Sequence, residues 1–293
     1  MRYAAIDTGS NAVRLLIADV TDNDGTYTFK KNTLIRVPLR LGDDAFLEQH
    51  ISDKKADDLV KTMAAFKNLM DVYKVNDYMA CATSAMREAK NGPAIIKRIK
   101  EEANLDLEII HGEREAGIIY ASHTGIDLDE SKNYLYIDVG GGSTELTLFS
   151  DGDLIASQSF NIGTIRILDN QDKDETWKEM QDFVRKHTKS YKEIHGVGTG
   201  GNINKLFKLS NEKDGEPMSY TKLKSLYSYL ASYSLKDRIN VLKLNQDRAD
   251  VIIPACEIYT TVMKWANIKQ IYVPSVGMAD GIIQTLIEKN LMK

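Results

Sequence analysis

One pattern occurs twice in this sequence, as Tyr3-Ala4-Ala5-Ile6-Asp7-Thr8-Gly9-Ser10-Asn11 and as Tyr134-Leu135-Tyr136-Ile137-Asp138-Val139-Gly140-Gly141-Gly142-Ser143-Thr144. In both copies an apolar segment runs into an aspartate and a turn of small residues. A second apolar segment follows, at residues 13–17 and 146–149, so each copy is predicted to form a β-hairpin. Glycine at the tip of a hairpin lets successive backbone N–H groups converge on an anion. The two tips therefore predict a phosphate site.

The order of the predicted elements also repeats. After the first hairpin we expect extended segments at 26–31 and 34–39, a helix at 53–73, a strand at 78–83, a polar turn at 84–92, a helix at 93–103, a strand at 107–110 and a helix at 113–121. From residue 132 the strand, the aspartate turn and the next strand begin again, so duplication of a β-β-β-α-β-α unit is the economical explanation. We expect an α/β fold with two domains, residues 1–124 and 125–293, and a last helix at about 281–293 that packs back on the first domain.

Composition limits the classes of function. The 293 residues are 43% hydrophobic and 27% charged, with a net charge of −4, and no apolar run approaches the roughly 20 residues that span a bilayer. These values favour a cytoplasmic protein that binds neither membrane nor nucleic acid, because nucleic-acid binders usually carry a basic excess. The basic cluster Lys97-Arg98-Lys100 alternates with isoleucines and is interpreted as a solvated helix face. Cys81 and Cys256 are expected to be buried free thiols.

A closer resemblance depends on five segments that occur in one order along almost the whole chain. The segments are Ala5-Ile6-Asp7-Thr8-Gly9-Ser10-Asn11 with Arg14, Ala82-Thr83-Ser84-Ala85-Met86-Arg87-Glu88-Ala89, Gly112-Glu113-Arg114-Glu115-Ala116, Ile137-Asp138-Val139-Gly140-Gly141-Gly142-Ser143-Thr144-Glu145, and Gly196-Val197-Gly198-Thr199-Gly200-Gly201-Asn202. One Asp-x-Gly turn alone would be a weak signal, whereas five ordered segments are a strong one. With these segments the sequence resembles the exopolyphosphatase and guanosine pentaphosphate phosphohydrolase (Ppx/GppA) family, within the superfamily of actin, the sugar kinases and the heat-shock ATPases.

The resemblance implies a fold and an activity. The fold would be two duplicated ribonuclease H-like (actin-like ATPase) domains, with mixed β-sheets flanked by helices and the active site in the interdomain cleft. The activity would be magnesium-dependent release of terminal orthophosphate from inorganic polyphosphate. Hydrolysis of the 5′-terminal phosphate of guanosine pentaphosphate is the alternative, and a nucleotide-binding switch or kinase of the superfamily is a third reading. A possible homodimer would extend the binding channel.

The resemblance also assigns roles to residues, one position at a time. Glu115 would be the catalytic base, and Asp7 and Asp138 would lie beside the phosphate and its Mg²⁺ ion. Arg87 matches the arginine that meets the phosphate chain. The remaining expected phosphate-binding residues belong to the turns: Gly9, Ser10, Asn11, Gly140, Gly141, Gly142, Ser143, Thr144, Gly198, Gly200 and Gly201.

Each role has a structural alternative that the sequence leaves open. The two aspartates could be ordinary turn residues, and the glycines at 198–201 could form only a tight turn and a helix cap. Glu115 could be a solvated residue in the first turn of a helix, favoured there by the helix dipole. Arg87 could simply form an ion pair with Glu88 or Glu115. The sequence departs from the family pattern at Ala12, where a serine is common, and at Ala279-Asp280, where Arg-Glu is common.

Overall fold

The computed structural model describes residues 1–121, 128–129 and 131–291, and the chain divides into two compact units. Unit 1 contains residues 1–125 and 276–293, and unit 2 contains residues 126–275. The expected domain boundary between residues 124 and 125 lies outside the described residues.

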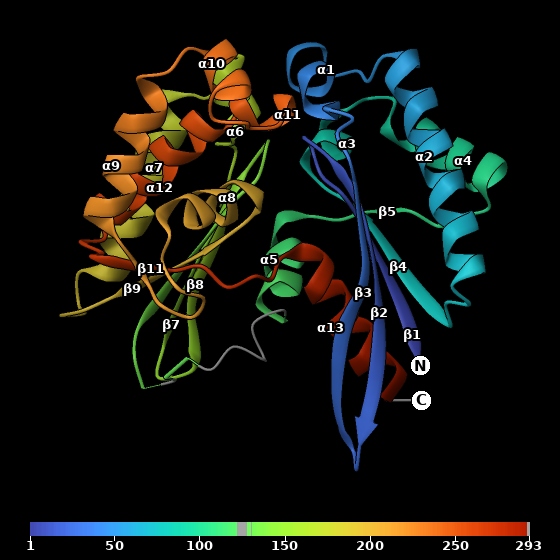
Figure 1. Ribbon diagram of the computed structural model, residues 1–293, viewed down its shortest axis with the longest axis horizontal. Helices are drawn as coiled ribbons and strands as arrows, with labels where there is room; N and C mark the ends of the chain where they lie inside the picture. The colour runs from blue at the N-terminus through green and yellow to red at the C-terminus, as the bar shows by residue number, and fades with distance from the viewer. Residues whose placement is uncertain (122–127, 130, 292–293) are drawn as a thin grey trace. The chain divides into compact units, whose positions relative to one another are not determined.

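Unit 1 is built on a mixed sheet of five strands in the order β3-β2-β1-β4-β5 (Figure 1). β1 pairs antiparallel with β2, and β2 with β3, while β4 and β5 continue the sheet in parallel. The middle of β1 consists of buried apolar residues because both faces of this strand are covered. The elements of the unit are β1 (Arg2–Thr8), β2 (Val13–Asn23), β3 (Thr26–Val37), α1 (Leu41–Glu48), α2 (Asp53–Val72), β4 (Asp77–Ala82), α3 (Ser84–Glu88), α4 (Gly92–Ala103), β5 (Glu108–Ile109), α5 (Gly112–Ala121) and α13 (Met278–Leu291).

Helices cover this sheet on both sides. α5 and α13 pack against each other, and their apolar side chains share one core cluster with Tyr3, Ala5 and Leu16 of the sheet. α2 and α4 pack together on the other side (Figure 1). At Gly281 of α13 a Cβ atom would overlap the carbonyl oxygen of Ile118 in α5, so the close contact of these two helices depends on glycine.

A β-bulge interrupts the pairing of β2 with β3. Thr33 lies opposite Ile17 and Lys31 lies opposite Ala18, so Asn32 is the extra residue. The two extended segments expected at 26–31 and 34–39 are therefore one strand with a bulge between them, and that prediction was wrong. The predicted polar turn at 84–92 was also partly wrong, because it contains the short helix α3.

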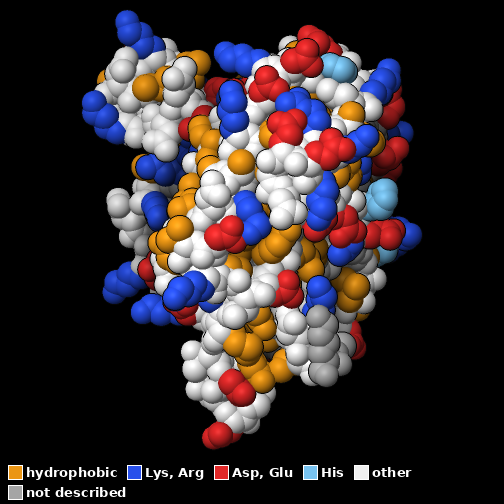
Figure 2. Space-filling model, turned by 90° about the vertical axis from the view of Figure 1, so that its right-hand side faces the viewer, with side chains coloured by type: hydrophobic (Ala, Val, Ile, Leu, Met, Phe, Trp, Pro, Cys, Tyr) orange, Lys and Arg blue, Asp and Glu red, His pale blue; other side chains and the backbone are white. Residues whose placement is uncertain are grey.

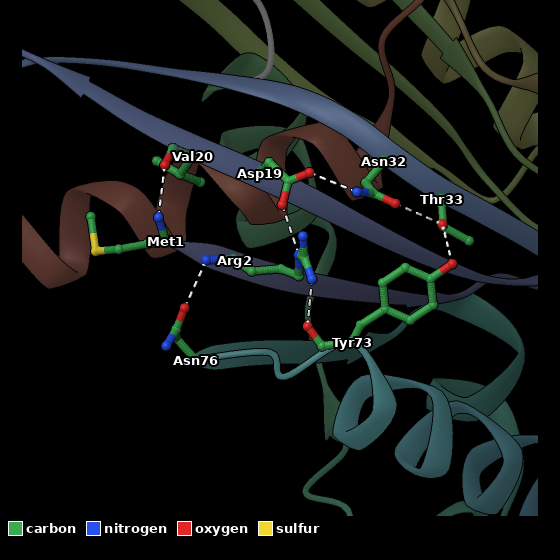
Figure 3. A network of polar contacts seen from close by, with 8 residues as sticks. All are labelled: Met1, Arg2, Asp19, Val20, Asn32, Thr33, Tyr73 and Asn76. Carbon is green, nitrogen blue, oxygen red and sulfur yellow. Dashed lines mark hydrogen bonds and ion pairs between the residues drawn. The ribbon is translucent and has the colours of Figure 1, made fainter.

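Polar contacts hold the bulge in place (Figure 3). Asn32 donates a hydrogen bond to Oδ2 of Asp19 at 2.6 Å, and Nε of Arg2 donates to Oδ1 of the same carboxylate at 2.7 Å. Thr33 Oγ1 donates to the Tyr73 hydroxyl at 3.0 Å, which joins the bulge to the end of α2. The bulge changes the alternation of β3, so that Lys31 reaches Oδ1 of Asp280 in α13 at 2.7 Å.

Unit 2 repeats the same topology. Its sheet has the order β10-β11-β9-β6-β7-β8, in which β8-β7-β6-β9-β11 corresponds to β3-β2-β1-β4-β5 of unit 1. This correspondence confirms the predicted duplication. The elements are β6 (Tyr134–Val139), β7 (Thr144–Ser150), β8 (Asp153–Phe160), α6 (Thr164–Leu168), α7 (Asp174–Thr188), β9 (His195–Thr199), α8 (Gly201–Ser210), β10 (Met218–Ser219), α9 (Tyr220–Ala231), α10 (Leu235–Asn240), α11 (Gln246–Ala249), α12 (Ile252–Trp265) and β11 (Gln270–Tyr272).

Charges on the surface are mixed. On the face shown in Figure 2, basic side chains are interspersed with acidic ones. Arg98 is paired with Asp57 at 2.8 Å, and Lys100 with Asp106 at 2.8 Å, so the basic cluster at 97–100 is a solvated helix face as predicted. Cys81 and Cys256 are buried free thiols, also as predicted. Among the described residues, every helix is too short or too polar to cross a lipid bilayer.

Candidate active site

The first aspartate turn lies at the end of β1. Gly9 N–H donates to the carbonyl oxygen of Ala12 at 3.2 Å and closes the turn. Asp7 is buried, and Arg14, its partner in the β1–β2 register, donates from Nη1 to its Oδ2 at 2.7 Å. The ion pair holds this carboxylate in one orientation.

Two short helices that the sequence did not predict hold the rest of this turn. The Ser10 and Ser84 hydroxyl oxygens are 2.8 Å apart, and both side chains are buried. The N–H of Gly42, in α1, donates to the Ser10 carbonyl oxygen at 2.9 Å, and the N–H of Arg40 donates to that of Asn11 at 3.0 Å. The turn is therefore fixed by α1 and α3 rather than by its own residues alone.

Glu115 lies in the first turn of α5 and is only 8% exposed. The structural alternative of a solvated helix residue is therefore wrong. Nη1 of Arg87 is 3.6 Å from Oε2 of Glu115 and donates a hydrogen bond to the Ile110 carbonyl oxygen at 2.7 Å. The ion pair of Arg87 with Glu115, which was the structural alternative, exists and places a guanidinium beside the carboxylate; the phosphate role of Arg87 stays a prediction.

Cys81 shows that Asp7 and Glu115 belong to one neighbourhood. It lies opposite Asp7 in the parallel register of β1 and β4. Burial raises the pKa of the Cys81 thiol to about 12; Arg114 acts in the opposite direction, and the charges of Asp7, Glu108 and Glu115 add to the rise. Both carboxylates therefore act on the same thiol within unit 1.

The second turn, Gly140 to Gly142, is braced by α6. The N–H of Thr164 donates to the Gly140 carbonyl oxygen at 3.1 Å and that of Ile165 to the Gly141 carbonyl oxygen at 2.9 Å. Nε of the buried Arg166 donates to the Gly142 carbonyl oxygen at 2.6 Å. The approach is so close that a Cβ atom at Gly163 would overlap Gly141.

This bracing orients the amides of the turn. A trans peptide holds its C=O and the following N–H on opposite sides, and the structure has no cis peptide bond among the residues it describes. Because three successive carbonyl groups point at α6, the N–H groups of residues 141–143 point away from it. Successive amides that share one orientation can form a concave anion site, and the phosphate role of residues 141–143 stays a prediction.

Two side chains of this turn are committed to the interior. The Thr144 hydroxyl donates to the Ile162 carbonyl oxygen at 2.7 Å, and Thr144 is fully buried. Ser143 is also buried. The Thr144 hydroxyl thus has a structural role, while the predicted phosphate role of this segment depends on its backbone.

Asp138 lies at the end of β6 and differs from Asp7 in its neighbours. Its partner across β7 is Glu145, and its partner on β9 is Thr199. Thr199 Oγ1 donates to Oδ1 of Asp138 at 2.6 Å. Asp7 therefore has an arginine and a cysteine at the positions where Asp138 has a glutamate and a threonine, and the second copy is the more acidic.

The glycine segment at the end of β9 is explained in part by packing. A Cβ atom at Gly198 would lie 2.9 Å from side-chain atoms of Ile203 and Ile271. Gly200 has φ +106° and lies close to Asp138 and to the Val139 carbonyl oxygen, so this position requires glycine. Arg248 donates a hydrogen bond to the Gly201 carbonyl oxygen. A phosphate role for Gly198, Gly200 and Gly201 stays a prediction.

Asp280, where the sequence departs from the family pattern, is structural. It pairs with Lys31 and accepts a hydrogen bond from the Gly277 N–H at 3.0 Å. Burial raises its pKa above the ordinary value of 3.8, although Lys31 acts in the opposite direction.

The donor groups of both turns suit a hard divalent cation. Among residues 1–121, 128–129 and 131–291, no group of three or more His, Cys, Asp or Glu side chains could enclose a metal. Each turn instead offers an oriented carboxylate, and Glu145 lies opposite Asp138. Mg²⁺ commonly takes one or two carboxylates and completes its shell with water and substrate phosphates, so these residues fit it.

Known proteins of similar sequence cover most of the chain. A model of the Ppx/GppA phosphatase family matches residues 19–290. The chain is 23% identical to a putative exopolyphosphatase of Haemophilus influenzae, with 98% of this chain and 91% of that protein covered. It is 30% identical over 205 residues to a bifunctional 3-dehydroquinate synthase/phosphatase of Fusobacterium nucleatum, and the match covers 62% of this chain and 31% of that protein.

Solved structures show the same fold. The crystal structure of the Aquifex aeolicus member of the Ppx/GppA family has a TM-score of 0.79 and 25% identity, covering 99% of this chain and 98% of that one. The structure of an exopolyphosphatase from Cytophaga hutchinsonii has a TM-score of 0.85 at 24% identity, with the same coverage.

Proposed function

Because the chain belongs to the Ppx/GppA phosphatase family, we propose that it is a magnesium-dependent phosphoanhydride hydrolase that releases terminal orthophosphate from inorganic polyphosphate. The observation that carries this proposal is the buried carboxylate of Glu115, which lies beside Arg87 in the unit that also contains the Asp7 turn. Relatives named as exopolyphosphatases, including that of Haemophilus influenzae, support the choice of substrate.

The backbone amides of residues 141–143 would bind oxygens of the terminal phosphoryl group. Phosphoryl transfer requires positioning and charge neutralisation more than covalent chemistry. Amides that are already oriented stabilise the charge of the transition state without reorganising. Arg166 and α6 would preserve that orientation through the three carbonyl contacts.

Glu115 would act as the general base. It would take a proton from a water molecule whose oxygen forms the new bond to phosphorus, while the anhydride P–O bond breaks and the shortened chain leaves. Arg87 would keep the carboxylate in place and present its guanidinium to the phosphate chain. The low exposure of Glu115 also restricts bulk water around the carboxylate.

Asp138, with Asp7, would hold the metal. The bound Mg²⁺ would supply charge neutralisation at the phosphate oxygens. Arg14 competes with the metal for the carboxylate of Asp7. That the two turns bind one substrate in an interdomain cleft stays a prediction, as does the homodimer.

Guanosine pentaphosphate is the second candidate substrate. A relative in Photobacterium profundum, named guanosine-5′-triphosphate,3′-diphosphate pyrophosphatase, is 24% identical, and the match covers 98% of this chain and 59% of that protein. The same general base and phosphate-binding turns would act on both substrates. Guanosine pentaphosphate would in addition need a binding site for its purine, which polyphosphate lacks.

Phosphate release tests these alternatives directly. Purified protein is incubated with short polyphosphate, long polyphosphate, guanosine pentaphosphate and ATP, each with Mg²⁺ and with EDTA. We expect orthophosphate from polyphosphate in the Mg²⁺ samples alone. Faster release from guanosine pentaphosphate would favour the second candidate. The hydrolase proposal would be wrong if the protein phosphorylates a sugar with ATP and releases no orthophosphate from short polyphosphate, long polyphosphate or guanosine pentaphosphate.

A further inference from the structure

A hydrogen-bonded chain leads from the core of unit 2 to Asp138. Tyr259 lies in the middle of α12, is fully buried, and donates its hydroxyl proton to the Thr199 carbonyl oxygen. Thr199 in turn donates its own hydroxyl proton to Oδ1 of Asp138 at 2.6 Å. The Asp138 carboxylate is therefore oriented by Thr199, and the backbone of Thr199 is itself fixed by the Tyr259 hydroxyl.

The surrounding backbone leaves little freedom to this chain. Thr199 and Asp138 are direct partners in the parallel register of β9 and β6. At Gly200, which follows, a Cβ atom would lie 3.0 Å from the Val139 carbonyl oxygen, 3.3 Å from Oδ1 of Asp138 and 3.7 Å from the Tyr259 hydroxyl. The Val139 carbonyl oxygen, Oδ1 of Asp138 and the Tyr259 hydroxyl thus all lie within contact distance of the Cβ position at Gly200.

The chemistry of each link has a fixed direction. Burial, and then the charge of Asp138, raise the pKa of Tyr259 well above its usual value, so the phenol stays protonated and acts as a donor. A backbone carbonyl can only accept, so the Tyr259 proton points to Thr199. The Asp138 carboxylate accepts from the Thr199 hydroxyl, which orients one of its two oxygens.

The first copy of the motif has no such chain at the corresponding position. There the β4 partner of Asp7 is the buried Cys81, and Asp7 is held instead by the cationic Arg14. A neutral hydroxyl orients a carboxylate without cancelling its charge. Side chains that orient metal-binding carboxylates in this way typically control metal affinity.

We propose that Thr199 and Tyr259 are positioning residues that hold Asp138 ready to bind a divalent cation. The inference rests on the proposed function, in which Asp138 is a metal ligand. It separates the two aspartates by role, with Asp138 directed to the cation and Asp7 held by Arg14.

The test measures metal affinity apart from catalysis. Mn²⁺ is titrated in the presence of inorganic phosphate against the full chain and followed by electron paramagnetic resonance. Thr199→Val removes the hydroxyl at nearly constant volume and should raise the Mn²⁺ dissociation constant about 10–100-fold. Tyr259→Phe should raise the Mn²⁺ dissociation constant less than Thr199→Val does. Thr199→Ser keeps the hydroxyl and should have the wild-type dissociation constant. Asp138→Asn should abolish binding.

A matched control separates positioning from stability. Thr188 is also buried in unit 2, and its hydroxyl donates to the Val184 carbonyl oxygen at 2.7 Å, within α7. Thr188→Val should lower the melting temperature and leave the Mn²⁺ affinity unchanged. The Mg²⁺ concentration that gives half-maximal turnover should follow the Mn²⁺ constants across the series.

If folded Thr199→Val or Asp138→Asn binds Mn²⁺ with wild-type affinity, the positioning inference is wrong. That result would not by itself contradict the proposal that the protein hydrolyses polyphosphate. Absence of Mn²⁺ binding by the wild-type protein would overturn the positioning inference as well. If the wild-type protein releases no phosphate but the variants lose Mn²⁺ affinity as expected, the positioning role is supported and the proposed substrate is wrong.

Discussion

Replacing Glu115 by glutamine tests the proposed reaction most directly. Glutamine has nearly the same shape as glutamate and still accepts a hydrogen bond, but it cannot take a proton from water. General-base assistance is typically worth 10²–10⁴-fold, which corresponds to about 2.7–5.4 kcal/mol of activation free energy. We expect kcat for phosphate release to fall by that factor while KM for polyphosphate changes little.

The effect on stability should be smaller. The Arg87–Glu115 pair has a 3.6 Å N–O separation, and its side chains are 20% and 11% exposed. Glutamine retains a polar contact with Arg87, so the loss in unfolding free energy should be about 1–3 kcal/mol, the range for a buried polar group that loses a partner. A domain of ordinary stability stays folded after such a change, and the loss of turnover will therefore report on chemistry.

Glu113→Gln is the matched control for Glu115→Gln. Glu113 lies two residues earlier in the first turn of α5 and is exposed. Its replacement should leave both kcat and the melting temperature near the wild-type values. A Glu115→Gln protein with more than about a tenth of wild-type kcat would refute the assignment of the base, and so would an equal loss in Glu113→Gln.

Three further predictions concern the backbone and the polar network. Gly163→Ala should push α6 away from the Gly140–Gly142 turn. The expected loss is about 1–3 kcal/mol in unfolding free energy and on the order of 10²-fold in turnover. Denaturant unfolding and phosphate release measure the two losses, and normal turnover would contradict the prediction. Gly281→Ala should likewise lower the unfolding free energy by about 1–3 kcal/mol, because the added methyl group would overlap Ile118. Gly117→Ala, whose methyl group would meet nothing within 4 Å, should raise the unfolding free energy by up to about 1 kcal/mol through helix propensity. Equal melting temperatures for these two variants would show that α5 and α13 are not in close contact. Hydrogen bonds from Asn32 and then Arg2 lower the pKa of Asp19 from its ordinary 3.8, so its contribution to stability is present above that value and is lost as the pH falls through the folded-state pKa. After allowance for exposure, Asp19→Asn should cost about 0.2–1 kcal/mol at neutral pH and nothing in strong acid, as urea unfolding at both conditions would show; a difference that persists in acid would contradict the role of the charge.

The duplicated hairpins could be predicted from the sequence because their signals are local. A short apolar run, an aspartate and a glycine turn follow one another within about a dozen positions, and the shortness of the run and the turn that bounds it favour a strand over a helix. The pairing of Asp7 with Arg14 belongs to the same local pattern, since the two residues face each other across a tight hairpin. The fold class followed from the repeat of these signals.

Features set by distant contacts could not be predicted. The helices α1 and α3 are too short to show a clear period, and the bulge at Asn32 depends on side chains from three other segments. Glu115 has the local signature of an exposed residue at the start of a helix, yet it is buried. Tyr259 lies in an apolar run that predicts only core packing, and no local signal indicates that its hydroxyl bonds to the end of β9 beside Asp138.

The position of α13 has a consequence for the synthesis of the protein. This helix follows all of unit 2 in the sequence but belongs to the core of unit 1, where it covers the apolar side of α5 next to Ile118. A chain leaves the ribosome from its N-terminus, and domains generally fold as units during translation. Unit 2 is continuous and can be completed first, whereas α5, the helix that carries Glu115, waits for α13, which is synthesised after unit 2. A product interrupted before α13 would therefore contain both aspartate turns and still lack the helix that covers α5.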